Sequence, residues 1–233
     1  MDILYTLAEN YDGDELRYSL RSLANVPHDR VFFVGGCPKW VKGVEHIPTT
    51  QSGTKYKNTT NNLKAACNDT RLSDDFIYFN DDFFVLQPIK DPAKDLNIYN
   101  GTVQSVLDTL YEQHTIATPY MVGMEQTRDL LRFLGKAEPL SYELHAPFVF
   151  NKFNFLKMFE IEGVDKINCF HKRTFYGNLY YTGGKSQKDV KIFAGRKFNT
   201  DTLGTFLSCA NNGFDLVRPY LQAKFQNKSP YEI

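Results

Sequence analysis

The chain has 233 residues, of which 42% are hydrophobic and 23% charged, a composition that excludes disordered and fibrous proteins. Lys plus Arg and Asp plus Glu both number 27, so a formal net charge of zero argues against nucleic-acid binding through a broad basic surface but allows a local basic patch. The charge is unevenly divided: residues 1–150 carry 14 basic and 20 acidic side chains (net −6), and residues 151–233 carry 13 and 7 (net +6).

The first hundred residues predict alternating strands and helices. Strands are predicted at four apolar runs, the last with a polar break: 2–7, 30–36, 44–48 and 75–86. Helices are predicted at 15–23, where leucines recur at helical spacing, and at 58–69. This order is typical of the α/β class, with a mostly parallel sheet flanked by helices.

Beyond residue 100 the pattern becomes helical. The spacing of Val103, Val106, Leu107 and Leu110 predicts an amphipathic helix. Further helices are predicted at 124–134, 151–160, 202–210 and 215–226. Residues 183–196, rich in Gly and Lys, predict a loop or hairpin. We therefore expect one domain over residues 1–233 with a helix-rich C-terminal half.

The cysteines indicate a reducing compartment. Cys37, Cys67, Cys169 and Cys209 are far apart and lack metal-ligand spacing, so free thiols are expected. No apolar run approaches the length of a membrane span, and residues 2–7 are too short for a signal-peptide core. We therefore expect a cytoplasmic protein.

The segment with the clearest chemistry places Asn80, Asp81 and Asp82 directly after an apolar strand. Ligands of parallel sheets bind outside the carboxyl ends of the strands, and carboxylates there suit Mg²⁺ or Mn²⁺. Such a metal would neutralise a nucleotide diphosphate. Asp81 or Asp82 capping a turn is the alternative. The five flanking aromatic residues favour a cation, because paired acids in apolar surroundings are costly without one.

A DxD-like motif after a strand resembles the signature of GT-A-fold glycosyltransferases, whose carboxylates hold a divalent metal on a nucleotide sugar. The fuller segment LSDDFIYFNDDFF (72–84) resembles the L-S-x-x-F-I-Y-x-N-D-D block of the Stealth sugar-phosphate transferases. Residues 145–147, 170–173 and 229–232 resemble later blocks of that family, in the same order. Residues 7–9 (LAE) stand where the family carries Trp-Asp. Compact chains with this pattern are also similar to bacteriophage glycosyltransferases.

The resemblance implies a nucleotide-sugar-binding half (1–100) and an acceptor-side half (101–233), with a UDP-sugar as the expected donor. Asp82, together with Asp81, would hold Mn²⁺ or Mg²⁺. His171 would either complete the metal shell or lie in a basic turn that faces phosphate.

Residues elsewhere in the first half are candidates for donor binding. Tyr5 and Thr6, at the end of the first strand, would border the base and ribose, as in enzymes of similar fold. The helix start at 55–62 offers an anion or sugar-hydroxyl site through four side chains: Lys55, Lys57, Asn58 and Asn61. The alternative there is an ordinary solvated, capped helix start. Arg17 would reach the diphosphate or pair with a neighbouring acid.

The catalytic candidates lie in the second half. His145 can accept the proton of an attacking hydroxyl, and Glu143 would orient it or replace it as the base. The alternative is that His145 is a satisfied polar residue. Arg173 or Lys172 would stabilise charge on the leaving phosphate.

Three functions follow. Attack at the anomeric carbon of the donor gives a glycosyltransferase, which the lost Trp-Asp favours. Attack at the sugar-proximal phosphorus gives a Stealth-type sugar-1-phosphate transferase. The third possible function is that of a non-enzymatic carbohydrate-binding protein. The acceptor is a glycan or a hydroxymethylated base in viral DNA, in which case the compartment is the host cytoplasm. The lysines of residues 185–197, together with Arg196, would contact DNA phosphates or form a loop or lid over the donor.

Overall fold

The computed structural model describes residues 1–181, 183–195 and 197–233. A five-stranded sheet in the order β3-β2-β1-β4-β7 forms the centre of the molecule. Its strands are β1 (Asp2–Leu7), β2 (Val31–Gly35), β3 (Glu45–Ile47), β4 (Asp75–Phe79) and β7 (Phe148–Asn151). The first four are mutually parallel, and β7 runs antiparallel to β4. The mostly parallel α/β sheet predicted from the sequence is therefore confirmed.

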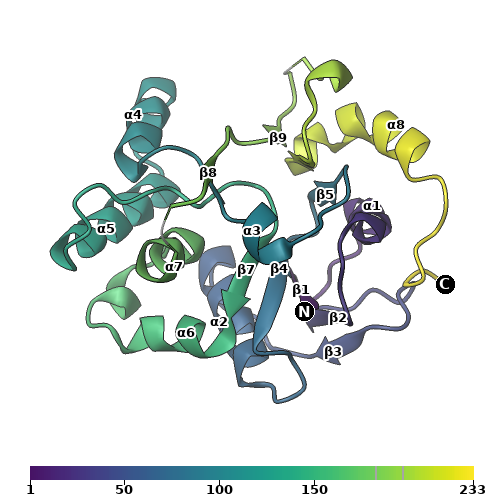
Figure 1. Cartoon of the computed structure of the whole chain (residues 1–233), viewed down its shortest axis with the longest axis horizontal. Coiled ribbons are helices and arrows are strands. Elements are labelled where there is room, and N and C mark those ends of the chain that lie inside the picture. Colours follow the sequence, from purple (N-terminus) through teal and green to yellow (C-terminus); the bar gives the residue numbers. More distant parts are fainter. Residues whose placement is uncertain (182, 196) are drawn as a thin grey trace.

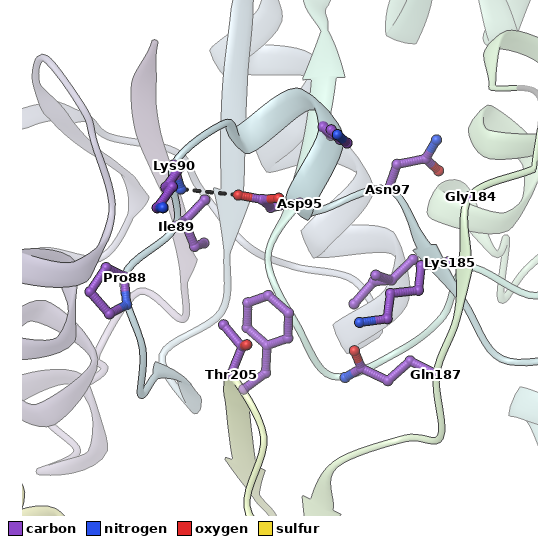
Figure 2. Close-up of a pocket in the computed structure, with 12 residues that line it drawn as sticks. Pro88, Ile89, Lys90, Asp95, Asn97, Gly184, Lys185, Gln187 and Thr205 are labelled. Carbon is purple, nitrogen blue, oxygen red and sulfur yellow. Dashed lines mark hydrogen bonds between the residues drawn. The ribbon is translucent and has the colours of Figure 1, made fainter.

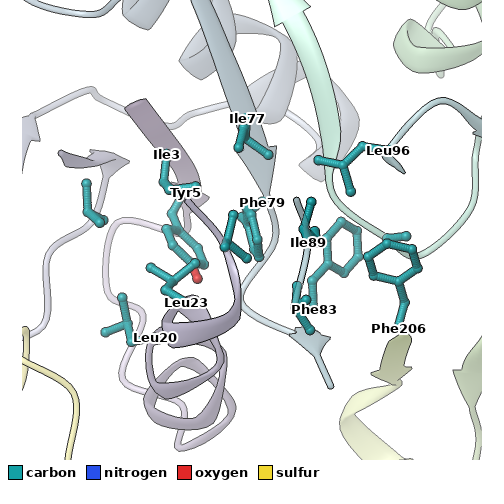
Figure 3. Close-up of a cluster of buried hydrophobic side chains, with 14 of the residues drawn as sticks. Ile3, Tyr5, Leu20, Leu23, Ile77, Phe79, Phe83, Ile89, Leu96 and Phe206 are labelled. Atoms are coloured by element: carbon teal, nitrogen blue, oxygen red, sulfur yellow. The ribbon is translucent and has the colours of Figure 1, made fainter. Parts of the chain in front are cut away.

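Helices α1 (Glu15–Ser22) and α2 (Lys55–Asn68) cover opposite faces of this sheet. Along β1, Ile3 and Tyr5 pack with the leucines of α1, whereas Leu4 packs with Leu63 of α2. Successive side chains of a strand point to opposite faces, so a strand covered on both sides is apolar throughout. Figure 3 shows the α1 side, where Leu20 and Leu23 lie beside Tyr5.

The C-terminal half is rich in helices, as predicted. They are α4 (Val103–Gln113), α5 (Pro119–Phe133), α6 (Lys152–Lys157), α7 (Lys172–Tyr180) and α8 (Phe214–Lys224), and a short α3 (Pro92–Asp95) precedes them. In Figure 1, α4–α7 gather on one side of the sheet and α8 lies near α1 on the other. No helix in the described part of the chain is long and apolar enough to cross a membrane.

The prediction of a helix at 202–210 is wrong. Residues 206–209 instead form strand β10 (Phe206–Cys209), which pairs antiparallel with β5 (Phe83–Val85) and parallel with β9 (Lys191–Ile192). All four residues of β10 are buried. A run this short is compatible with a helix or a strand, and pairing with β5 and β9 makes it a strand. The strand predicted at 75–86 is split at the polar break, since β5 leaves the central sheet to join β10.

The hairpin alternative for residues 183–196 is also wrong within the described residues. Strand β8 (Lys185–Ser186) pairs with β6 (Ile98–Tyr99), and β9 pairs with β10, so β8 and β9 serve different sheets. Arg196 lies outside the described residues. Helix α7 was not predicted; it depends on a close approach, because a Cβ on Gly177 would come within 2.4 Å of the Tyr142 ring.

Candidate active site

The order of the central strands reverses between β1 and β4, and the carboxyl ends of these two strands are the expected ligand site of an open α/β sheet. The side chains of Thr6, Tyr78 and Asn80 lie together at these strand ends. The Tyr78 hydroxyl lies 3.3 Å from Thr6 Oγ1 and donates a hydrogen bond to Asn80 Oδ1 at 2.6 Å. Beside it, Gly35 has a φ of +97°, and a Cβ there would lie 2.2 Å from the carbonyl oxygen of Leu7. Glycine is therefore required where β2 leaves the sheet against β1.

Two adjacent carboxylates, Asp81 and Asp82, follow β4 and form what we call the acidic pair. Oδ2 of Asp82 accepts hydrogen bonds from Lys191 Nζ at 3.0 Å and from Ser208 Oγ at 3.1 Å. Burial and the neighbouring Asp82 charge raise the pKa of Asp81 to about 6. The acidic pair is thus held where negative charge is costly, and Lys191 supplies a cation to it.

Asp81 and Asp82 offer the type of donor that divalent cations prefer, although Oδ2 of Asp82 is bound by Lys191. Mg²⁺ and Mn²⁺ are commonly held by one or two carboxylates, with substrate phosphates and water as the remaining ligands. His171 does not join this site: among the described residues, no three His, Cys, Asp or Glu side chains group closely enough to hold a metal ion. The first alternative for His171, completion of the metal shell, is therefore wrong.

On the other side of Asn80 lies a pocket of about 320 Å³, which we call the basic pocket. Its charged and titratable lining comes from α2, from the segment before β7 and from the start of α7: Lys55, Glu143, His145, His171, Lys172 and Arg173. Tyr78, Asn80 and Tyr120 also line it. The pocket therefore brings several of the predicted donor-binding and catalytic residues to the carboxyl end of β4.

Glu143 is committed to Arg173 and does not orient His145. Its Oε2 accepts hydrogen bonds from Nε and Nη2 of Arg173 at 3.1 and 3.0 Å, and its Oε1 accepts from the backbone N–H groups of Arg173 and Thr174 at the start of α7. Burial alone would raise the pKa of Glu143, but the Arg173 charge lowers it to about 2. A carboxylate with so low a pKa is a poor general base, so the prediction of this role for Glu143 is not supported.

Arg173 is neutralised by Glu143, and its guanidinium also donates to the carbonyl oxygen of Leu144. Lys172 makes one long hydrogen bond, from Nζ to the carbonyl oxygen of Phe170 at 3.4 Å, and burial lowers its pKa. Together with Lys55, Lys172 therefore gives the basic pocket its positive charge.

His171 is 3% exposed, and its Nε2 lies 3.0 Å from the carbonyl oxygen of Tyr120. Within the described part of the chain no group forms a hydrogen bond with its buried Nδ1. Burial lowers the pKa of His171, which favours the neutral ring. Buried polar atoms are rarely left unsatisfied, so this nitrogen marks a place for a polar ligand group or a water. This position next to Lys172 and Arg173 agrees with the alternative prediction that His171 lies in a basic turn.

His145 is paired with Asp189, a residue that the sequence analysis missed. The two side chains meet at 2.7 Å between Nδ1 of His145 and Oδ2 of Asp189, and the side chain of His145 remains 26% exposed in the basic pocket. The one available signal was weak: Asp189 is the only acid in the Gly- and Lys-rich segment 183–196. Lys191 and Ser208 reach Asp82 from more than one hundred residues away, and nothing in the sequence near them marked either as its partner.

Two predicted donor-binding residues have structural positions instead. Tyr5 is completely buried, and its hydroxyl lies 2.8 Å from Ser19 Oγ in the core of Figure 3. The expectation that Tyr5 borders the base is therefore wrong, since its side chain points into the α1 face. The guanidinium of Arg17 stacks over Trp40 at 3.9 Å and forms ion pairs with Asp14 and Glu232. The pairing with Asp14 agrees with the alternative that Arg17 binds a neighbouring acid rather than the diphosphate.

At the start of α2, only Lys55 among the four predicted side chains lines the basic pocket. Asn58 exchanges hydrogen bonds with the backbone of Gly53, and Thr54 caps the helix by accepting from the N–H of Lys57. Lys57 and Asn61 are exposed beyond the pocket lining. The start of α2 therefore has features of both predicted alternatives: Lys55 lines the pocket, and the rest is an ordinary capped helix start.

A second, larger groove of about 590 Å³ lies away from the strand ends, between α3, β8 and the start of β10. Figure 2 shows Lys90 and Lys185 at this groove, with Asp95 bound to the backbone N–H of Lys90. Lys185 thus faces this groove while Lys191 binds Asp82, so the lysines of residues 185–191 do not form one continuous surface.

No protein-family model matches the chain, and no curated protein matches it by sequence. Among solved structures the chain is similar to the galactosyltransferase LgtC in complex with donor and acceptor sugar analogues, with a TM-score of 0.53 and 10% identity over 98% of this chain and 96% of that one. It is also similar to an active-site mutant of LgtC, with a TM-score of 0.53 and 11% identity over 96% of this chain and 95% of that one. The predicted GT-A-like glycosyltransferase fold is therefore confirmed.

Proposed function

We propose that this protein is a glycosyltransferase that moves a sugar from a nucleotide-sugar donor to an acceptor hydroxyl. One observation carries the proposal: Asn80, which lines the basic pocket together with His145, directly precedes the acidic pair at the carboxyl end of β4, beside the point where the strand order reverses. The likeness to LgtC supports it at the level of the fold.

The donor would lie across Asn80, with its diphosphate between the acidic pair and the basic pocket. Asp81 and Asp82 would hold Mn²⁺ or Mg²⁺, which when bound would neutralise the diphosphate and favour its departure. Lys55 and Lys172 would bind diphosphate oxygens from the pocket side, and Lys172 takes the charge-stabilising role because Arg173 is already paired. Thr6 and Tyr78 would offer hydroxyl groups to the donor at the end of β1.

His145 would act as the general base. The proton of the acceptor hydroxyl passes to the imidazole, the acceptor oxygen bonds to the anomeric carbon, and the bond from that carbon to the diphosphate breaks. A nucleoside diphosphate is released.

The Stealth-type alternative, sugar-1-phosphate transfer, is favoured by the segment 72–84 and would release a nucleoside monophosphate. The carbohydrate-binding alternative explains the aromatic content but leaves the partly buried acidic pair without a purpose. The acceptor is either a glycan or a hydroxymethylated base in viral DNA, and the compartment is the cytoplasm, that of the host if the source is viral.

The experiment is incubation of the protein with a panel of nucleotide sugars, UDP-sugars first, with Mn²⁺ and with Mg²⁺. Released nucleoside diphosphate and nucleoside monophosphate are assayed separately. Diphosphate release that EDTA abolishes supports the proposal, and monophosphate release selects the Stealth-type reaction. Sugar binding that is insensitive to EDTA, with no turnover of any donor, would select the binding protein.

A further inference from the structure

Asp189 holds both the backbone and the ring of His145. Its Oδ2 meets Nδ1 of the imidazole at 2.7 Å, and its Oδ1 accepts the backbone N–H of His145 at 2.9 Å. The N–H of Val190 donates to the same Oδ1 at 2.9 Å. One carboxylate therefore fixes where the ring lies and how it is turned.

The charge of Asp189 sets the tautomer of His145. Partial burial by itself would raise the pKa of Asp189, but donors from His145 and Val190 lower it below its ordinary value. An ionised carboxylate can only accept hydrogen bonds, so Nδ1 of His145 must carry the proton. Nε2 is then the nitrogen with a free lone pair.

The surroundings keep this pair in place. The ring of His145 meets Phe83 edge to face, with 6.5 Å between ring centres. Val190 packs against the core, and Lys191 begins strand β9, so the segment that carries Asp189 is anchored directly after it. The other charged groups of the pocket lining are Lys55, Lys172 and the Glu143–Arg173 ion pair, and Glu143 is fully engaged by Arg173 and α7.

We propose that Asp189 is a positioning residue, which holds the imidazole of His145 as the Nδ1–H tautomer with Nε2 ready to accept a proton. The role rests on the proposed glycosyl transfer. In that step the acceptor O–H bond breaks and its proton moves to Nε2. The oxygen bonds to the anomeric carbon, and the electron pair of the broken carbon–oxygen bond leaves on the diphosphate. Asp189 stays ionised and stabilises the imidazolium, as an aspartate does in a Ser-His-Asp triad.

The informative variant is Asp189→Asn, which keeps the size and shape of the side chain. Its oxygen can still accept the two backbone N–H groups of His145 and Val190, so its NH₂ group then faces Nδ1. An NH₂ group donates, which forces the proton of the imidazole onto Nε2 and removes the free lone pair there. The fold is kept while the tautomer is reversed.

Two measurements are made on the full chain. Nitrogen-15 NMR of the imidazoles reads the tautomer without any substrate, and we expect Nδ1–H in the wild type and Nε2–H in Asp189→Asn. With a donor identified by the nucleotide-sugar panel, kcat should fall about 10²–10⁴-fold while the donor KM changes little. Combining Asp189→Asn with His145→Ala should lower kcat no further than His145→Ala alone. Asp189→Glu should restore part of the rate, and Asp215→Asn, at an exposed site, should change neither measurement.

The proposal is overturned if wild-type His145 carries its proton on Nε2, or if Asp189→Asn leaves the tautomer unchanged. It is also overturned if Asp189→Asn turns over at the wild-type rate. If the wild type turns over no nucleotide sugar, the proposed function fails, whereas the NMR result still decides whether Asp189 sets the tautomer of His145.

Discussion

The acidic pair and the basic pocket place partly buried carboxylates in opposite electrostatic conditions. In the acidic pair, burial and a like charge raise the pKa of Asp81 to about 6. In the basic pocket, Arg173 lowers the pKa of Glu143 to about 2 in spite of its burial. Both carboxylates lie near the carboxyl end of the same strand, β4.

The difference separates a ligand-binding carboxylate from a structural one. Glu143 has its full set of partners within the chain and fixes the start of α7. Asp81 sits beside a like charge, and the ion pair that Lys191 forms is with its neighbour Asp82. A carboxylate whose charge is only partly neutralised by its neighbours is typical of functional sites. We therefore expect the acidic pair, and not Glu143, to bind a cation.

The largest effect is expected for Asp82→Asn. Loss of this carboxylate removes a metal ligand in the proposed site, so turnover should fall well beyond the roughly 10–100-fold cost of losing a group that only supports a ligand. Asp81→Asn should be severe but less so. Ser208→Ala is the matched control, since it removes one hydrogen bond to Asp82 but keeps the charge. Near wild-type activity of Asp82→Asn in metal-stripped buffer would end the metal hypothesis.

Next in size is the cost of breaking the ion pair of the basic pocket. Arg173→Met leaves Glu143 buried without its counter-ion, and the free energy of unfolding should fall by about 3–5 kcal/mol. Urea denaturation measures this change. Glu143→Gln combined with Arg173→Met should recover part of the loss, and Arg132→Met, at an exposed position, should cost little. A loss no larger for Arg173→Met than for this control would show that the pair is not effectively buried.

The same pair predicts a dependence of stability on pH. The pKa of Glu143 falls from an ordinary 4.5 to about 2 in the folded protein, so its contribution is full above about pH 4.5 and is lost as the pH falls towards 2. The shift corresponds to about 3 kcal/mol. Glu143→Gln should lack this part of the acid dependence when unfolding is followed from pH 6 to pH 2. An identical acid profile for the variant would assign the acid sensitivity to other groups.

A smaller and opposite effect is expected for Asp81→Asn in the absence of metal. Because burial and Asp82 disfavour the Asp81 charge, its removal should raise stability at neutral pH by on the order of 1 kcal/mol, or about 2–4 °C in Tm at this chain length. Mn²⁺ should raise the Tm of the wild type more than that of Asp81→Asn. The exposed Glu162→Gln serves as the control, and a Tm for Asp81→Asn that is lower than the wild-type value would refute the argument.

The smallest effect is expected for the double variant Lys185→Ala and Lys188→Ala. Lys191 is left intact because it binds Asp82, and we expect the loss of the two other lysines to leave glycan transfer almost unchanged. Duplex DNA binding is measured by fluorescence anisotropy at low and moderate salt. A DNA acceptor held by these lysines would instead show steep salt dependence, and the variant would lower the slope of log K against log salt by about 0.9 for each lost contact.

Local patterns predicted the sheet and the acidic pair, and they failed where distant segments meet. The centres of the first two strands, residues 3–5 and 31–34, are continuous apolar runs because helices cover both faces, and this signal is contained within each segment. β10 was mistaken for a helix because a run of four residues is too short to show a period, and pairing with β5 and β9 decided its conformation.

The α/β class, the helical second half and the position of Asp81 and Asp82 at the end of a strand can be read from the order of residues along the chain. The charged partners of the site residues could not be read in this way: Lys191 for Asp82, Arg173 for Glu143 and Asp189 for His145. Hydrophobic periodicity is repeated along one segment and can be read there, whereas an ion pair joins single residues from separate segments. Burial and the neighbouring charges then decide the chemistry of each carboxylate, because they set whether it binds a proton, binds a cation or stays ionised in an ion pair.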